Sequence, residues 1–292
     1  ILMGFILPAV MSSFKAARNT QISTELRGLE SAIAQFKSVY GVEPPSRILL
    51  YQNPTGTPSW QSHPGMFTDP ITGASVSYDM ERVRSRALIT RIWPNFDFTA
   101  TRNLAAPNGF LYLRGAECLV FFLGGGVVAS PTGAFALTGF SKNPLDPLSP
   151  ASGSESRDGP FFEFKPAQLK TTRNTADAGS ALIYVDPTPS QTLPYLYLSS
   201  YEGRGYSPQD ALVNPQAMPV PYPANTNLLD VYRVGNSVVA QKNKSFQLIS
   251  PGADGAYGSG GPFDANATNR ALNDRRDYDN ITNFNSGVLN SK

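Results

Sequence analysis

The sequence of 292 residues has little of the chemistry on which many enzymes and metal centres depend. It contains one cysteine, Cys118, and one histidine, His63. A single cysteine excludes an intramolecular disulfide and a cysteine-based metal cluster, and a single histidine excludes a multi-histidine zinc site. A serine–histidine–aspartate triad would have to use His63, which no Gly-x-Ser-x-Gly motif accompanies. We therefore expect a protein that is not an enzyme, with Cys118 as a small buried core residue in its apolar surroundings.

Charge is scarce as well. Charged residues make up 16% of the chain and the formal net charge is +2, against roughly 25% charged residues in an average soluble domain. No run of lysine and arginine with interleaved aromatic residues occurs, so we expect no nucleic-acid partner. Four arginines in residues 79–92 indicate a solvated face or ion pairs between subunits rather than a phosphate site. They are Arg82, Arg84, Arg86 and Arg91.

The remaining composition indicates a folded chain with many loops. Glycine and proline contribute 25 residues each, and 13 tyrosines with 17 phenylalanines are too many aromatic side chains for a disordered segment. The length allows one large domain or two small ones with a sizeable core. No repeat of about 20 to 50 residues is visible.

The chain opens in apolar sequence. Residues 1–11 are apolar, with Gly4 and Pro8 among them, but a bilayer span needs about 20 such residues. A basic flank and a small-residue cleavage site, which mark a secretory signal, are lacking. The run is either a buried helix end or part of a membrane segment, and we expect a further segment before it. We also expect Pro8 to loosen the helix locally, because proline removes a backbone donor.

A long amphipathic helix is predicted for residues 9–40. Its apolar stripe recurs at spacings of 4, 3, 4, 3 and 4 residues and consists of Ile22, Leu26, Leu29, Ile33, Phe36 and Tyr40. Charged residues, Glu25 among them, occupy the other faces. Gly41 and the pair Pro44-Pro45 end the helix. At 1.5 Å per residue the helix would be about 48 Å long.

Three sequence segments carry a resemblance to a known family. They are Leu7-Pro8-Ala9-Val10, Ala16-Ala17-Arg18-Asn19-Thr20-Gln21 and Tyr40-Gly41-Val42-Glu43-Pro44-Pro45. Together they resemble the type IV pilin and type II secretion pseudopilin family, and residues 117–125 and 158–166 resemble segments of its large planctomycete-type members. In that family, about fourteen residues with the prepilin cleavage point and a docking glutamate precede this part of the helix.

The resemblance implies the fold class and the mode of assembly. It implies an α+β protein in which a long N-terminal amphipathic helix packs on an antiparallel β-sheet head with large loop insertions and a C-terminal metal-binding loop. Residues 1–45 would form the assembly and anchor helix, and residues 46–292 the globular head. The assembly residues would be Ile1, Leu2, Phe5, Ile6, Leu7, Pro8, Val10 and Phe14.

The body offers weaker signals. We predict a short helix over residues 79–92 with Asp79 as its N-cap, and a buried helix or strand over residues 116–123, ended by the glycine triplet 124–126. Strands are predicted at residues 161–164, 181–185, 195–198 and 246–249. Residues 46–73, 143–160 and 203–227 are rich in proline, glycine and polar residues and are predicted to be loops.

Residues 248–287 form a glycine-rich acidic segment. Such a loop presents carboxylates and free carbonyls, and calcium prefers six to eight oxygen ligands in flexible geometry. The spacing is not that of an EF-hand, and an ordinary surface turn remains the alternative. Major pseudopilins hold a structural calcium in a Gly-Ala-Asp-Gly loop followed by an Asp-x-Asp-Ile-type segment, which residues 252–255 and 277–281 resemble. The resemblance thus implies Ca²⁺ bound by Asp254, Asp277 and Asp279, with the carbonyls of Pro251 and Ala256, and Asp264 or Asp274 as replacements.

The leading hypothesis is a structural subunit of a helical filament, a pilus or secretion pseudopilus. It would be a homo-oligomer outside the cell or in the periplasm, anchored in the inner membrane before assembly and handled by pilus or secretion machinery. The alternative is a membrane-tethered surface binding protein that uses the same anchor without polymerising. A secreted enzyme is a third possibility, and a glycosidase with paired carboxylates remains compatible with the 22 acidic residues.

Overall fold

The computed structural model describes most of the chain. The described residues are 3–68, 75–102, 104, 109–125, 127–129, 135–151, 155–171, 182–211, 230–267, 272 and 274–290. At residues 3–9, 127–129, 135, 136, 208 and 211 the description covers the backbone alone.

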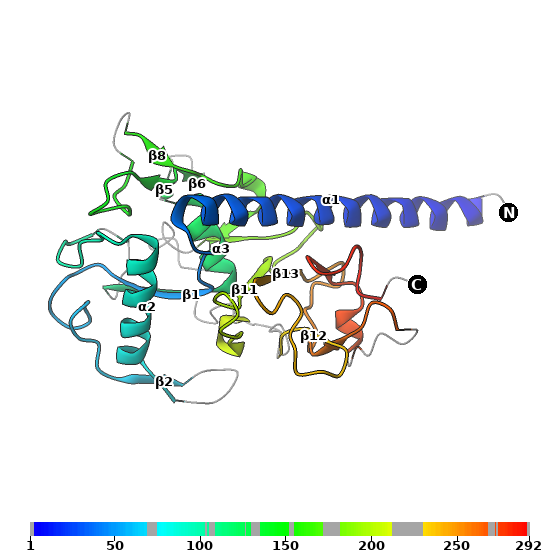
Figure 1. Cartoon of the computed structure of the whole chain (residues 1–292). Coiled ribbons are helices and arrows are strands. Elements are labelled where there is room, and N and C mark those ends of the chain that lie inside the picture. The colour runs from blue at the N-terminus through cyan, green and yellow to red at the C-terminus, as the bar shows by residue number, and fades with distance from the viewer. Residues whose placement is uncertain are drawn as a thin grey trace.

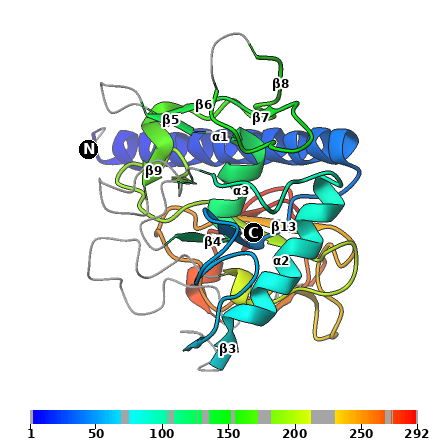
Figure 2. The same cartoon turned by 90° about the vertical axis from the view of Figure 1, so that its left-hand side faces the viewer.

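Helices of three lengths organise the fold. They are α1 (Met3–Tyr40), α2 (Tyr78–Ile92) and α3 (Gly115–Gly124). The long helix α1 runs across the upper part of the molecule in Figure 1, with α3 beneath its C-terminal half, α2 further below, and the short strands between residues 127 and 158 above that half. Figure 2 shows the same arrangement turned by 90°, with these strands on one side of α1 and the rest of the body, α2 and α3 included, on the other. The short 3₁₀ helices are η1 (Pro166–Gln168), η3 (Pro208–Ala211) and η5 (Arg275–Asp277).

The described strands form small sheets. The largest is antiparallel and contains β11 (Leu196–Ser199), β13 (Phe246–Ser250) and β15 (Ile281–Thr282) in that order. The antiparallel pairs are β1 (Arg47–Tyr51) with β4 (Phe110–Arg114), β2 (Met66–Thr68) with β3 (Ser75–Ser77), β5 (Val127–Ala129) with β6 (Phe135–Leu137), β7 (Phe140–Ser141) with β8 (Arg157–Asp158), and β9 (Leu169–Thr171) with β10 (Leu182–Tyr184). The pair β12 (Arg233–Val234) and β14 (Pro262–Phe263) is parallel. The protein is therefore a mixed helix and sheet protein of the α+β kind.

The stripe predicted on the first helix is the part of α1 that the body buries. Ile22, Leu26, Leu29, Ile33 and Phe36 are each at most 2% exposed, and Tyr40 is half-buried. They belong to the main hydrophobic cluster, and α1 contacts helix α3 and strand β15. The backbone is helical from Met3 through Pro8 to Tyr40, which gives a length of about 57 Å at 1.5 Å per residue.

Residues 116–123, predicted as a buried helix or strand, belong to helix α3. This helix is buried on nearly every side, and Cys118 is 0% exposed, as predicted. Gly125 follows the helix as the C-cap residue. Gly125 has φ +70°, and a Cβ there would lie 2.2 Å from the carbonyl carbon of Gly139. Only glycine fits this close crossing of two backbone segments.

The loop prediction for residues 46–73 is wrong at both ends. Residues 47–51 form β1, in which all five side chains are buried, and residues 66–68 form β2. Strand β1 is an unbroken apolar run apart from Arg47, as expected for a strand that is covered on both faces. The prolines and glycines that follow it had obscured this short run.

Two further expectations need correction. The N-cap of α2 is Ser77, whose hydroxyl accepts a hydrogen bond from the Met80 amide, and Asp79 lies inside the first turn. Residues 161–164 form no strand; the ring of Phe161 packs 5.4 Å from that of Phe36 instead. The other predicted strands are confirmed as β10, β11 and β13.

Truncating the stripe should destabilise the whole body. Phe36 is fully buried, and its ring centroid lies 5.7 Å from that of Phe122 on α3. We expect Phe36→Ala to lower the free energy of unfolding by about 3–5 kcal/mol, because it opens a cavity in the core. Val39→Ala, at a position 52% exposed on the same helix, is the control and should change it by less than about 0.5 kcal/mol. Urea denaturation measures both, and equal effects would show that the stripe is not core.

Candidate functional site

In the N-terminal half of α1, the body does not cover the described side chains of residues 10–17. Residues 10–17 are exposed at every position, and the large apolar side chains among them are Val10 at 43%, Met11 at 67% and Phe14 at 67% exposure. Apolar side chains clustered in this way on a surface mark a contact with another protein or with lipid. In Figure 1 this half of the helix extends away from the body.

Two of the expected assembly residues, Val10 and Phe14, are thus placed on an open helix surface. For Phe5, Ile6, Leu7 and Pro8 the structure describes the backbone helix but not the side chains, and Ile1 and Leu2 lie outside the described residues. None of the helices in the described part of the chain combines the length and the apolar character that a bilayer span requires.

A buried carboxylate marks the point where the open half of α1 gives way to the covered half. Glu25, placed by the sequence pattern on a polar face, is 7% exposed. It accepts hydrogen bonds from Lys165 Nζ at 2.5 Å, Gln168 Nε2 at 3.1 Å and Tyr195 Oη at 2.8 Å. Because these donors come from η1, its flank and the residue before β11, they fix the rotation of α1 about its axis. Sequence periodicity could not reveal this, since a polar residue beside an apolar stripe is usually exposed.

The acidic segment brings two of the three expected aspartates together. Asp279 Oδ2 accepts hydrogen bonds from the amides of Ala253 at 2.7 Å and Asp254 at 2.9 Å. The other oxygen, Oδ1, is buried and has no hydrogen-bond partner. Desolvation first, and then the negative charge of Asp279, raise the pKa of Asp254 to about 6. The two carboxylates therefore repel each other across the turn.

The third aspartate, Asp277, has partners of its own. Its side chain is fully buried and accepts hydrogen bonds from Tyr232 Oη at 2.5 Å and from the amides of Gly260 at 3.0 Å and Ser259 at 3.3 Å. Burial is the main cause that raises the pKa of Asp277. Both carboxylate oxygens of Asp277 therefore accept hydrogen bonds that hold residues 257–260 next to Tyr232.

The glycines of this segment let the backbone approach the carboxylates. A Cβ at Gly252 would lie 2.4 Å from the backbone oxygen of Asp279, and one at Gly258 would lie 2.6 Å from Asp277 Cγ. Both glycines also have positive φ, +69° and +68°. The glycine-rich composition therefore serves the contact between residues 251–260 and 277–280, which the sequence-based resemblance had also joined.

The fit to a hard cation is partial. Asp254 and the unpartnered Asp279 Oδ1 supply carboxylate oxygens at one place, as calcium requires. Among the described residues no group of three or more acidic, histidine or cysteine side chains could hold a metal ion. Of the replacements, Asp274 is paired with Arg276 at 2.5 Å, and Asp264 accepts from the amide of Asn266. For Pro251 and Ala256 the structure places the residues in the turn, with Pro251 buried.

A cluster of buried charges lies elsewhere in the body and was missed by sequence reasoning. Arg47 on β1 pairs with Glu81 on α2 at 3.1 Å and with Asp210 in η3 at 3.2 Å. Asp210 also accepts hydrogen bonds from Ser46 Oγ at 2.6 Å and Tyr201 Oη at 2.7 Å. These side chains pair with one another and join three elements that are distant in sequence, which indicates a structural role. Buried pairs of this kind specify how elements dock more than they add stability.

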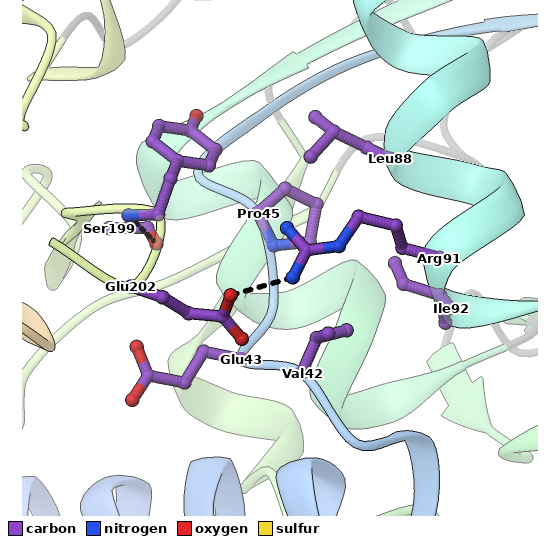
Figure 3. Close-up of a pocket in the computed structure, with 9 residues that line it drawn as sticks. Val42, Glu43, Pro45, Leu88, Arg91, Ile92, Ser199 and Glu202 are labelled. Carbon is purple, nitrogen blue, oxygen red and sulfur yellow. Dashed lines mark hydrogen bonds and ion pairs between the residues drawn. The ribbon is translucent and has the colours of Figure 1, made fainter. Parts of the chain in front are cut away.

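A pocket beside this cluster is too small for a ligand. Arg91 Nη2 and Glu202 Oε2 form an ion pair of 2.6 Å across it (Figure 3). The remaining cavity of about 20 Å³ has room for little more than one water molecule. Three of the four arginines of α2 form ion pairs within the chain, in place of the solvated face or the pairs between subunits that the sequence suggested: Arg82 and Arg84 pair with acids on the same helix, Asp79 and Glu81.

His63 lies in an aromatic cluster. Its ring stacks on Tyr78 at 4.1 Å, and Nδ1 shares a hydrogen bond of 2.7 Å with Tyr51 Oη. Its backbone amide donates to Asp79 Oδ1 at 3.2 Å. Burial is the main cause that lowers the pKa of His63. These contacts are those of a packed side chain with a satisfied ring nitrogen.

The lowered pKa of His63 has a measurable consequence. A histidine whose folded-state pKa lies below its unfolded value, about 6.5, stabilises the fold above that value and loses this contribution as the pH falls below it. We expect nuclear magnetic resonance titration of the single histidine ring to give a pKa below 6.5. The loss of stability between pH 7 and pH 5 should be smaller in His63→Asn than in the wild type. A pKa at or above 6.5 would contradict the buried, neutral ring.

Comparison with protein-family profiles, with curated proteins and with solved structures gave no match to this chain. The functional argument therefore depends on the residues themselves. Two features of the structure carry it, the uncovered apolar half of α1 and the close pair of carboxylates at Asp254 and Asp279.

Proposed function

We propose that the protein is a structural subunit of a helical filament, a pilus or secretion pseudopilus, and that α1 joins the subunits. The observation that carries this proposal is the division of α1 into a covered half and an open half. The same helix that fills the core of the body through Leu29 and Phe36 presents Met11 and Phe14 to solvent. A helix held rigidly by its own body at one end is suited to bind copies of itself at the other.

The physical driving force is the burial of apolar surface. Each large apolar side chain removed from water contributes roughly 1.5–3 kcal/mol, and Val10, Met11 and Phe14 are all available for this. In a bundle of identical helices, the exposed surface of α1 in one subunit would pack against a different surface of the next subunit. A head-to-tail contact of this type propagates as a filament when its rotation does not close into a ring.

The proposal extends to location and partners. Before assembly the open half of α1 would lie in the inner membrane, and pilus or secretion machinery would extract it into an extracellular or periplasmic filament. The tethered surface protein, the alternative from sequence, uses the same apolar surface but stays in lipid. We also propose that the protein has no enzymatic role, in line with the packed environments of His63 and Cys118.

Negative charge introduced into the exposed part of α1 should prevent filament assembly without unfolding the body. We expect the double variant Met11→Asp with Phe14→Asp to form no filaments in electron micrographs of the full chain, because a desolvated carboxylate opposes helix packing. Its melting temperature should match that of the wild type, since neither side chain touches the core.

The control for this experiment is Val39→Asp, which adds a carboxylate at an exposed position of the covered half. It should form normal filaments. Filaments from the double variant would contradict the role of α1, and a wild-type chain that binds lipid vesicles without forming fibres would favour the tether instead.

We further propose that the turn formed by Asp254 and Asp279 holds a structural Ca²⁺. The support is the repulsion between these two carboxylates together with the buried, unpartnered Oδ1 of Asp279, both of which a cation would relieve. Bound calcium would supply positive charge and tie residues 251–256 to residues 277–281. Asp277 was the third expected ligand, but its carboxylate accepts a hydrogen bond from Tyr232.

Calcium should raise the thermal stability of the wild type but not that of the Asp254→Asn variant. With free calcium at 100 times its dissociation constant, the wild type should gain about 2.7 kcal/mol, or roughly 5–10 °C in melting temperature. In excess chelator we expect Asp254→Asn to melt above the wild type, because the repulsion is gone, and added calcium should not raise it further.

Asp230→Asn is the matched control, because it removes one surface carboxylate outside the acidic turn. It should respond to calcium as the wild type does. Identical melting curves for the wild type in chelator and in millimolar calcium would show that the turn is held by its hydrogen bonds alone.

A further inference from the structure

Helix α2 has an apolar face that the body leaves open. Met80 and Val83 are 73% and 58% exposed, and Ala87 and Thr90 are exposed as well. Their spacings of 3, 4 and 3 residues place these four residues, the α2 seam, along one face of the helix. In Figure 1, α2 lies on the side of the molecule away from the N-terminal end of α1, and in Figure 2 it lies toward the viewer. The α2 seam is thus separate from the open half of α1.

The seam is fixed on the outside of the molecule and has little need of water. The opposite face of α2, which includes Ser85 and Ile89, is buried in the body, so the helix cannot turn to hide the seam. Thr90 Oγ1 donates a hydrogen bond to the carbonyl of Arg86 at 3.0 Å, so this hydroxyl is satisfied within the helix. Apolar residues at this spacing are typical of a helix that pairs with another helix.

One flank of the α2 seam carries two opposite charges, Asp79 and Arg86. The Asp79 side chain is 52% exposed, and its hydrogen bonds from Arg82 Nε and the His63 amide both go to Oδ1. Arg86 is exposed, and its guanidinium lies 4.3 Å from the centre of the Phe98 ring. It forms no ion pair with any residue that the structure describes. Both charges can therefore take a further partner.

These charges determine how a second copy would fit. In an antiparallel pair of identical helices a twofold axis keeps the same flank of both helices on one side. With Val83 opposite Ala87, Asp79 of one copy lies beside Arg86 of the other, and this pair of charges occurs twice. In a parallel pair Arg86 would face the other flank, where Arg91 lies. We propose that α2 binds α2 of a second copy of this chain as an antiparallel pair.

The other flank of the seam does not oppose this arrangement. Its arginines, Arg84 and Arg91, pair within the chain with Glu81 at 3.6 Å and Glu202 at 2.6 Å. A contact through one helix of 15 residues is smaller than a standard interface and belongs to the weak, transient class. Between two filaments side by side, many such contacts would act together. The pairing itself needs no filament, and only this bundling of filaments rests on the proposed function.

Other occupants match the charges less well. In the open half of α1, Phe14 is followed by Lys15 and Arg18, which would bring further positive charge to Arg86. An anionic membrane would attract Arg86 but repel Asp79. A second α2 supplies an opposite charge to both.

Self-association should be measured in a chain that cannot form filaments. The double variant Met11→Asp with Phe14→Asp is the background, and the full chain should show a reversible monomer–dimer equilibrium in sedimentation velocity at about 10–500 µM, as expected for a weak contact. Adding Val83→Asp should lower the association constant about tenfold or more, because it places two carboxylates in the seam. Val238→Asp, at a position 90% exposed on the turn after β12, is the matched control and should leave the constant unchanged.

Mixing two charge variants tests the paired residues directly. In the same background, Arg86→Glu sets acid against acid and Asp79→Lys sets base against base, so each alone should associate about tenfold more weakly or worse. In an equimolar mixture each chain supplies the charge that the other lacks, and dimers should return to nearly the original strength. Melting curves check that each variant is folded, because Asp79 also pairs with Arg82.

Cysteine cross-linking gives the direction of the helices without changing Asp79. Under mild oxidation, Val83→Cys mixed with Ala87→Cys should form the mixed disulfide faster than either variant forms a disulfide with itself, because these positions face each other only in the antiparallel pair. The native Cys118 is 0% exposed and does not compete. Mass spectrometry distinguishes the three products.

Several results would overturn the proposal. They are a monomer at every concentration, a dimer that Val83→Asp leaves intact, a mixture of charge variants that associates no better than its components, or a faster disulfide between two Val83→Cys chains. Binding of the monomer to vesicles of anionic lipid, lost in Val83→Asp, would assign the surface to a membrane instead. If the wild type forms no filaments, the same series is carried out in the wild type, so the two proposals fail separately.

Discussion

The contact between α1 and α3 belongs to the main hydrophobic cluster, which also contains side chains of β1, α2, β4, β11 and β13. The stripe on α1 meets Phe122 through Phe36, whose rings are 5.7 Å apart. Tyr40 extends the same row of aromatic contacts to Trp93 and Phe140. Sheets of two or three short strands have little stability alone, so the small sheets of this protein depend on the helices that cover them.

Two buried charged side chains fix the positions of α1 and β1, which the apolar contact alone would leave free to shift. An apolar stripe allows a helix to slide or rotate, and Glu25 removes that freedom through three hydrogen bonds. Arg47 does the same for strand β1 by pairing with Glu81 and Asp210. Both are buried charges that are paired with other polar or charged groups, which is the condition under which such groups are tolerated in a core.

Sequence reasoning succeeded where one period dominated a long segment and failed where short runs were set among loop residues. The stripe on α1 was predictable residue by residue, because a 3.6-residue period sustained over several turns is specific to an amphipathic helix. Strand β1 was missed because five residues between proline-rich segments give no period. In the acidic segment the sequence paired residues 251–256 with residues 277–281, as the structure does. It could not foresee that Tyr232 holds Asp277, since that partner is 45 residues away.

The direction of α1 decides how the molecule would carry load. The stripe of residues 22–36 lies along the helix axis, so a pull on the N-terminal end acts parallel to the buried surface. All stripe contacts then resist together in shear, instead of opening one after another as they would if the helix were peeled away. Glu25, near the end of the covered half that faces the pull, adds its hydrogen bonds among the first contacts to be strained. Tension along α1 would thus load the buried surface between the helix and the body in shear.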